Sequence, residues 1–219
     1  MPDLNFKVVS AQPAPHAVSP LLNFSLQISE SNGAPIQAIV LRCQIRIEAA
    51  RRRYDTTEQE RLLDLFGEPS RWGQTLKSML WTHAAVVVPP FTSSTVVDLP
   101  VPCSFDFNIA ASKFFYALEN GEVPLSLLFS GTVFYAGENQ TLQIAQIPWE
   151  KEATFRLPVS VWKQMMEMYY PNSAWLCLRK DAFDQLYQFK SHNGLPSWEA
   201  ALEKLLEASA TAAADVTGR

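Results

Sequence analysis

Glycine and histidine are scarce in this chain of 219 residues, which contains eight glycines and three histidines. The glycines never form the patterns G-x-G-x-x-G or G-x-x-x-x-G-K, which excludes a dinucleotide-binding fingerprint and a P-loop. The histidines and cysteines form no C-x-x-C or H-x-x-x-H pair, so the ligand spacing of structural zinc sites is missing. We therefore expect no cofactor.

Cysteine is also rare, and its three residues, Cys43, Cys103 and Cys177, are odd in number and far apart. This pattern favours reduced thiols over a disulfide framework. The first residues contain no basic segment followed by an apolar stretch, as a secretory signal does. No run approaches the roughly 18 consecutive apolar residues that cross a bilayer. We predict a cytoplasmic protein without membrane insertion.

An excess of positive charge is missing as well, because 18 basic side chains face 22 acidic ones and the net charge is -4. Dedicated nucleic-acid binders use a basic excess to attract phosphate, so we expect no nucleic-acid partner. Hydrophobic residues, in contrast, make up 47% of the chain and aromatic residues 11%. The sequence therefore predicts a folded protein with a large core.

Apolar and polar residues alternate through much of the first half of the chain, which is typical of half-buried strands. The clearest run covers residues 41–49, where apolar side chains take every odd position and Arg42 and Arg46 take even ones. About nine such runs, separated by turn residues, are typical of an antiparallel sandwich or barrel. We predict a mainly β (α+β) fold, namely an antiparallel immunoglobulin-like β-sandwich with inserted short helices.

Two of the inserted helices have sequence signals of their own. Thr57 and Glu60 match a capping box, which predicts a helix over residues 57–66. A second short helix is expected over residues 110–118, where a Gly follows shortly after the apolar segment.

The apolar period becomes helical after Pro158, which divides the chain into three predicted parts. Residues 1–158 are expected to form the β-sandwich domain. Residues 159–207 are expected to form a C-terminal helical subdomain packed on it. Residues 208–219 are small, polar and Ala-rich, so we expect a disordered tail.

Arginine is unevenly distributed, with five of ten residues inside one twelve-residue stretch. One interpretation is a solvated strand face paired with nearby glutamates, and the other is a protein interface, where Arg is enriched. The aromatic residues near the helical end also have two interpretations. They either anchor a protein interface or simply pack within the fold. The candidate partner-binding residues are Arg42, Arg46, Arg51, Arg52, Arg53, Trp162 and Trp175.

Chemistry-bearing residues are few. No G-x-S-x-G elbow is present, and we expect no catalytic residue. Cys43, His83 and Cys103 lie on neighbouring predicted strands and are weak candidates for a metal site. Because Cys is among the most buried residue types, core thiols are the favoured interpretation.

Several segments resemble an uncharacterised bacterial family of unknown function that is often encoded beside nickel-iron hydrogenase structural and maturation genes. The similarity lies in residues 41–48, 51–54 and 60–69, and again in residues 101–103 and 129–134. It extends over roughly residues 4–206. The resemblance implies that the protein acts together with protein partners, and hydrogenase subunits or maturation factors are the candidates. It implies no catalytic residue.

Two hypotheses about function follow. The first is a non-catalytic accessory or assembly protein that binds a protein partner through the Arg-bearing strand face or the aromatic helical end. The alternative is a small-ligand-binding protein or enzyme with a pocket between sandwich and helices, near Cys43, His83 and Cys103.

Overall fold

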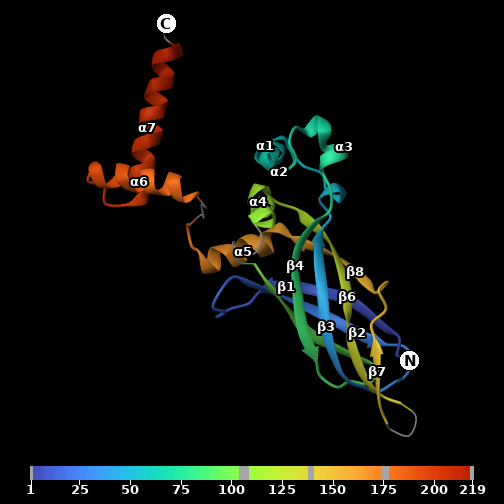
Figure 1. Ribbon diagram of the computed structural model, residues 1–219. Coiled ribbons are helices and arrows are strands. Elements are labelled where there is room, and N and C mark those ends of the chain that lie inside the picture. Colours follow the sequence, from blue (N-terminus) through green and yellow to red (C-terminus); the bar gives the residue numbers. More distant parts are fainter. Residues whose placement is uncertain (1, 104–108, 138–140, 174–177, 218–219) are drawn as a thin grey trace. The chain divides into compact units, whose positions relative to one another are not determined.

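The computed structural model describes residues 2–103, 109–137, 141–173 and 178–217. The chain forms two compact units, Met1–Ser173 and Ala174–Arg219 (Figure 1). Within the described residues, no helix is both long enough and apolar enough to cross a membrane.

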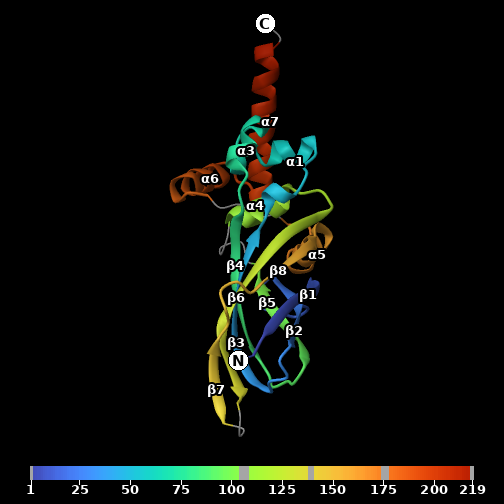
Figure 2. The same cartoon turned by 90° about the vertical axis from the view of Figure 1, so that its right-hand side faces the viewer.

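The strands of the first unit form two antiparallel sheets (Figure 2). The smaller sheet has the order β1-β2-β5, made of β1 (Leu4–Pro13), β2 (Leu21–Glu30) and β5 (Ser94–Pro102). The larger sheet has the order β4-β3-β6-β7, and β8 also pairs with β6; its members are β3 (Ile36–Ile47), β4 (Met79–Val88), β6 (Glu122–Ala136), β7 (Leu142–Gln146) and β8 (Glu152–Pro158).

Buried side chains of both sheets belong to one hydrophobic cluster. Every second residue of β2 from Leu22 to Ile28 is buried, as the period of two requires. The ring of Phe24 in β2 lies 6.3 Å from that of Trp81 in β4 and 5.6 Å from that of Phe155 in β8. The prediction of mainly antiparallel β structure with several helices is confirmed.

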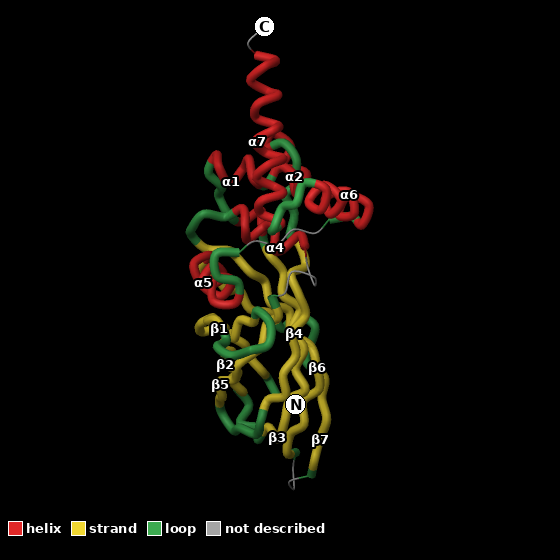
Figure 3. The backbone as a smooth tube through the Cα atoms, turned by 90° about the vertical axis from the view of Figure 1, so that its left-hand side faces the viewer, coloured by secondary structure: helices red, strands yellow, loops and turns green. Residues whose placement is uncertain are grey.

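Short helices connect the strands at one end of the sheets (Figure 3). Between β3 and β4 lie η1 (Ala49–Arg51), α1 (Thr56–Arg61), α2 (Leu63–Phe66), η2 (Pro69–Arg71) and α3 (Trp72–Thr75). Helix α4 (Ile109–Ala117) follows β5 and confirms the helix expected over residues 110–118. Phe66 of α2 meets Phe114 of α4 edge-on at 6.3 Å, so the inserted segments share an aromatic core.

The helix predicted over residues 57–66 is divided at Leu62 into α1 and α2, and its cap is not Thr57. Asp55 caps α1 instead, because its side chain accepts a hydrogen bond of 2.8 Å from the backbone N–H of Glu58. Asp is at least as good an N-cap as Thr, and here it stands two residues earlier.

Helix α5 (Val159–Tyr169) belongs to the first unit, whereas the sequence places the domain boundary before it. It buries Val159, Trp162 and Met165 in the shared hydrophobic cluster. Its Tyr169 hydroxyl donates to the carbonyl of Ala14 at 2.7 Å. A change from strand to helix period therefore marks a new element here, and the boundary between compact units follows Ser173.

The second unit contains helices α6 (Lys180–His192) and α7 (Trp198–Thr217). Ser197 caps α7, since its hydroxyl accepts from the backbone N–H of Ala200 at 3.1 Å. The expected disordered tail over residues 208–219 is wrong as far as Thr217, because α7 continues to that residue. Alanine has the highest helix propensity, so an Ala-rich end extends a helix that is already begun.

Glu30 holds the start of the N-terminal strand by hydrogen bonds. Its replacement by Gln is expected to make the free energy of unfolding depend less on pH in the acid range. Burial raises the pKa of this carboxyl, but backbone N–H groups, including those of Asp3, Asn32 and Ala34, lower it by more. Because the folded pKa lies below the ordinary value of 4.5, this stabilisation is present above that pH and is lost as the pH falls further.

The Glu30→Gln variant is therefore expected to lose about 1 kcal/mol at neutral pH and to match the parent in strong acid. Urea denaturation across this pH range measures the difference. An equal loss at every pH would show that the charge of Glu30 contributes nothing.

Candidate functional site

The outer face of the larger sheet carries Arg42 at its centre. Alternation along β3 turns Leu41 and Cys43 into the core and leaves Arg42 exposed. The residues opposite Arg42 are small, namely Ala85 on β4 and Ser130 on β6. No described residue forms a hydrogen bond or an ion pair with the Arg42 side chain, so its guanidinium is available to a carboxylate from outside.

Aliphatic side chains extend from Arg42 toward the edges of this sheet face. Val40, two residues before Arg42 on β3, pairs with Val87 of β4, whose relative exposure is 67%. On the edge strand β7, Leu142 and Ile144 are 63% and 62% exposed. We define the Arg42 face as Val40, Arg42, His83, Ala85, Val87, Phe134, Leu142 and Ile144.

This combination of chemistry is typical of a protein-binding surface. Large exposed apolar patches on a monomer often mark interaction sites. Arg is enriched in interfaces because its planar group both packs on apolar surface and binds carboxylates in bidentate fashion. The face therefore offers apolar contact area together with one unsatisfied positive charge.

Arg46 follows Arg42 on the same side of β3, but its side chain is engaged in hydrogen bonds within the protein. Its Nε donates to the Ser78 hydroxyl at 3.0 Å, and that hydroxyl donates to Glu48 at 3.1 Å. The short chain of bonds accounts for its partial burial. Arg46 is thus less available to a partner than Arg42.

Arg51 is the last residue of the 3-10 helix η1 and Arg53 follows two residues later; both are exposed. No described residue makes a hydrogen bond or an ion pair with either side chain. They remain candidate partner-binding residues at the helical end of the strands.

Arg52 is not an interface residue, which corrects the sequence-based prediction. Its side chain is only 8% exposed and forms an ion pair of 2.5 Å with the buried carboxylate of Glu58. It also donates to the carbonyls of Asn120 at 2.9 Å and Glu122 at 3.3 Å. Arg52 therefore joins the inserted helices to the start of β6.

The aromatic candidates also change. Trp162 of α5 is 4% exposed and stacks on Phe115 of α4 at 5.2 Å, so it is a core residue rather than a partner anchor. Trp175 lies outside the described residues.

The weak metal candidates do not converge. Cys43 points into the core, whereas His83 is exposed on the opposite face of the same sheet. Cys103 follows β5 of the other sheet and donates its thiol to the carbonyl of Val101. Among the described residues, no group of three or more His, Cys, Asp or Glu side chains lies close enough to hold a metal ion.

Burial also makes both described thiols poor nucleophiles. It raises the pKa of Cys43 to about 12, and it raises the pKa of Cys103 to about 12 against a smaller opposing effect of a hydrogen bond from the Leu22 backbone. A thiol that stays protonated neither attacks an electrophile nor ligates a metal readily.

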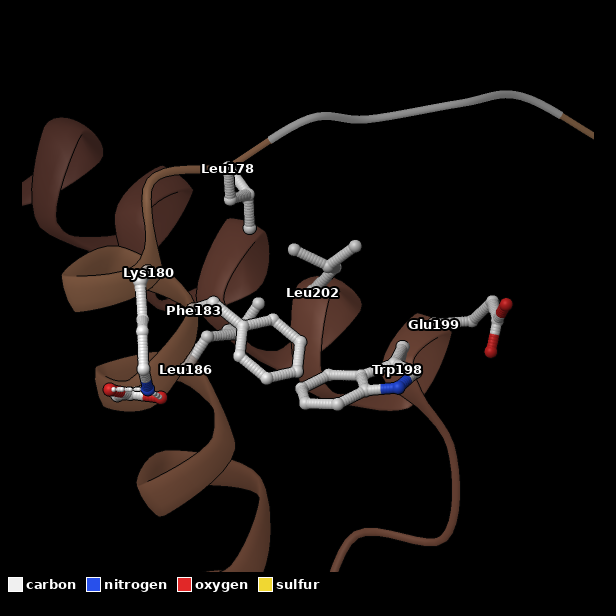
Figure 4. A pocket seen from close by; sticks show the side chains of 8 residues that line it. Leu178, Lys180, Phe183, Leu186, Trp198, Glu199 and Leu202 are labelled. Atoms are coloured by element: carbon white, nitrogen blue, oxygen red, sulfur yellow. Dashed lines mark hydrogen bonds and ion pairs between the residues drawn. The ribbon is translucent and has the colours of Figure 1, made fainter. Parts of the chain in front are cut away.

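The second unit contains an apolar groove between α6 and α7 (Figure 4). Its volume is about 630 Å³, and Leu178, Phe183, Leu186, Trp198 and Leu202 supply its apolar lining. The rings of Phe183 and Trp198 lie 5.2 Å apart. The sequence predicts helices in this region but not this groove, since a groove depends on how the helices pack.

Sequence reasoning also missed the aliphatic part of the Arg42 face. One signal was present, because residues 84–88 of β4 are apolar at both alternating positions. A strand with one side in water is expected to be polar at every second position. Its continuous apolar run indicates contact on both sides.

Residues 1–214 match the Family of unknown function (DUF6084). The chain belongs to this family. The prediction of an uncharacterised family is thus confirmed, and the hydrogenase gene neighbourhood stays a prediction. No curated protein matches the sequence of this DUF6084 member.

Solved structures show distant similarity to this DUF6084 chain. The CARDB domain of a Pyrococcus furiosus protein is 12% identical, with a TM-score of 0.27 over 71% of this chain and 91% of that one. The putative ApaA protein from Bordetella pertussis is 14% identical, with a TM-score of 0.23 over 71% and 93%. A β-glucosidase from Kluyveromyces marxianus is 8% identical, with a TM-score of 0.25 over 71% and 15%.

Proposed function

We propose that this chain is a non-catalytic accessory or assembly protein that binds a protein partner through the Arg42 face. The observation that carries the proposal is the Arg42 guanidinium, which is exposed among aliphatic side chains and lacks a partner in the described structure. A partner that presents apolar residues and a carboxylate would satisfy both features.

The proposal includes a fold and a location. The shared cluster of the two sheets supports an immunoglobulin-like sandwich. The reduced, buried thiols Cys43 and Cys103 support the cytoplasm. The resemblance noted in the sequence suggests hydrogenase subunits or maturation factors as the partner.

Charge reversal of Arg42 is expected to abolish partner capture without unfolding the protein. A tagged chain is used to capture proteins from its native cells at low and high salt, and mass spectrometry identifies what is retained. We expect hydrogenase subunits or maturation proteins with the parent chain, less at high salt, and none with Arg42→Glu. The substitution should change the free energy of unfolding by no more than about 0.5 kcal/mol, as is usual at surface positions.

Lys7→Glu is the matched control, because Lys7 is an exposed cation on β1 of the smaller sheet. It should capture the same proteins as the parent chain. Equal capture by Arg42→Glu and Lys7→Glu would remove the Arg42 face from consideration. A parent chain that elutes alone at both salt concentrations would favour the small-ligand alternative.

A further inference from the structure

Strand β7 lies at one edge of the larger sheet, where it pairs with β6 (Figure 2). Directly after β7, Ile147 donates its backbone N–H to the carbonyl of Gly131 on β6 at 2.9 Å. Because bonding alternates along an antiparallel pair, the odd-numbered residues of β7 also direct their backbone groups to β6. Leu142, Ile144 and Gln146 therefore direct theirs away from the sheet, and no described residue forms a hydrogen bond with those backbone groups.

This edge lacks the features that usually keep other strands away, namely charges, prolines, bulges or a covering element. The other edge strands of the described structure have them: β1 contains Lys7 and a β-bulge, and β5 contains Pro100. Strand β8 carries Glu152 and Arg156, and β4 packs beside β5. Strand β7 has neither a charged residue nor a proline. It is thus open to a further strand.

The side chains at this edge indicate the chemistry of such a strand. Leu142 and Ile144 are 63% and 62% exposed, and an added strand would place its own alternate side chains beside them. Trp149 is 88% exposed and follows β7 by three residues, which span at most about 11 Å. Trp is a frequent anchor in protein interfaces. The fitting occupant is therefore an extended segment with apolar residues at every second position.

We propose that β7 pairs with an extended segment of the protein partner, which adds a strand to the larger sheet and ends against Trp149. The inference rests on the proposed function, because it states how the partner of the Arg42 face is held. Leu142 and Ile144 belong to that face, so a partner that covers the face also reaches this edge. A second copy paired edge to edge would place two sheets side by side, and its β7 has no carboxylate to offer Arg42. In such strand addition, backbone bonds supply affinity and alternate side chains supply specificity.

Hydrogen exchange tests the pairing residue by residue. The probe is a peptide selected from a phage-displayed library of random sequences on the immobilised full chain. We expect it to carry apolar residues at alternate positions. On the isotope-labelled full chain, it should slow exchange of the Leu142, Ile144 and Gln146 amides at least about tenfold. The Gln143 and Ala145 amides should be protected even in the free chain, since they bond to β6.

Ile144→Pro removes an outward N–H but no bond to β6, and Pro is tolerated at such edge positions. Its thermal unfolding midpoint should stay near that of the parent, while it should bind the peptide at least about tenfold more weakly. Ile144→Val is the matched control, because it keeps both the N–H and an aliphatic side chain. It should bind like the parent. Trp149→Ala should weaken binding about tenfold, since it removes the anchor.

A library that yields no binder overturns the proposal, as does a bound peptide that leaves the three outward amides in fast exchange. Equal binding by Ile144→Pro or Trp149→Ala also overturns it. So does a dimer that Ile144→Pro dissociates, because the edge would then belong to a second copy. Partner capture that depends on Arg42 but not on Ile144 would remove the added strand and leave the proposed function intact. The exchange measurement uses the parent chain, so it decides the matter even where Ile144→Pro proves unstable.

Discussion

Replacing Glu58 by Gln is expected to lower the free energy of unfolding by about 3 to 5 kcal/mol, although the two side chains have nearly the same shape. The Glu58 carboxylate is 2% exposed and lies 2.5 Å from the Arg52 guanidinium. It also accepts the backbone N–H of Glu119 at 2.9 Å. The amide still accepts that bond, but it leaves Arg52 charged, buried and without a counter-ion.

Urea denaturation of Glu58→Gln and of Arg61→Gln compares the loss of a buried ion pair with the loss of an exposed one. The difference in the free energy of unfolding shows how much of the effect comes from burial. Arg61 forms an ion pair with Glu119 of similar length, 2.6 Å, but both side chains are about half exposed. Its loss should cost no more than about 1 kcal/mol. Equal effects of the two substitutions would mean that the Arg52–Glu58 pair is solvated in solution.

A double variant tests whether the unpaired charge of Arg52 causes this loss of stability. Arg52→Met with Glu58→Gln removes the orphaned cation as well as the anion. It should therefore be more stable than Glu58→Gln alone, because it no longer buries an uncompensated charge.

The strands could be predicted because their signal is local. Residues 41–49 alternate strictly, and β3 covers Ile36–Ile47 with the expected side inward. Helix α4 could be predicted for the same reason, since its signals also lie in neighbouring residues. The extent of α7 is harder to predict, because residues 208–217 have no apolar period and depend on the helix propensity of alanine.

The role of each arginine could not be predicted, because it depends on residues far away in the sequence. Arg42 and Arg52 belong to the same basic run, yet one is exposed and the other buried. The difference comes from Asn120 and Glu122, which meet Arg52 across almost 70 positions of sequence. Trp162 is core for a similar reason, since its contact Phe115 lies on another helix.

Whether the outer face of the larger sheet is exposed also depends on whether other parts of the chain cover it. The helices of the insertion gather at one end of the strands (Figure 3). Leu142 and Ile144 consequently remain exposed, although their pattern would suit a covered strand equally well. A sequence shows which side chains share a face, but the presence of a covering layer is a tertiary property.

Replacing Gly131 by Ala is expected to destabilise the first unit by at least about 3 kcal/mol. Gly131 lies on β6 directly opposite Leu41 of β3, with a backbone φ of +141°, which side-chain-bearing residues rarely adopt. A Cβ at this position would stand 2.1 Å from the carbonyl oxygen of Val40. Relief requires β3 and β6 to separate at the centre of the sheet, where Arg42 is presented.

Gly73→Ala is the control, because a Cβ there meets no atom within 4 Å and the residue lies in helix α3. It should leave stability unchanged or raise it by about 0.4 to 1 kcal/mol, since Ala restricts the unfolded chain. Thermal unfolding followed by circular dichroism compares the two variants. Because Val40 and Arg42 flank the strained contact, Gly131→Ala should also weaken partner capture in whatever fraction remains folded. Full capture by a folded Gly131→Ala protein would show that the Arg42 face tolerates displacement of β3.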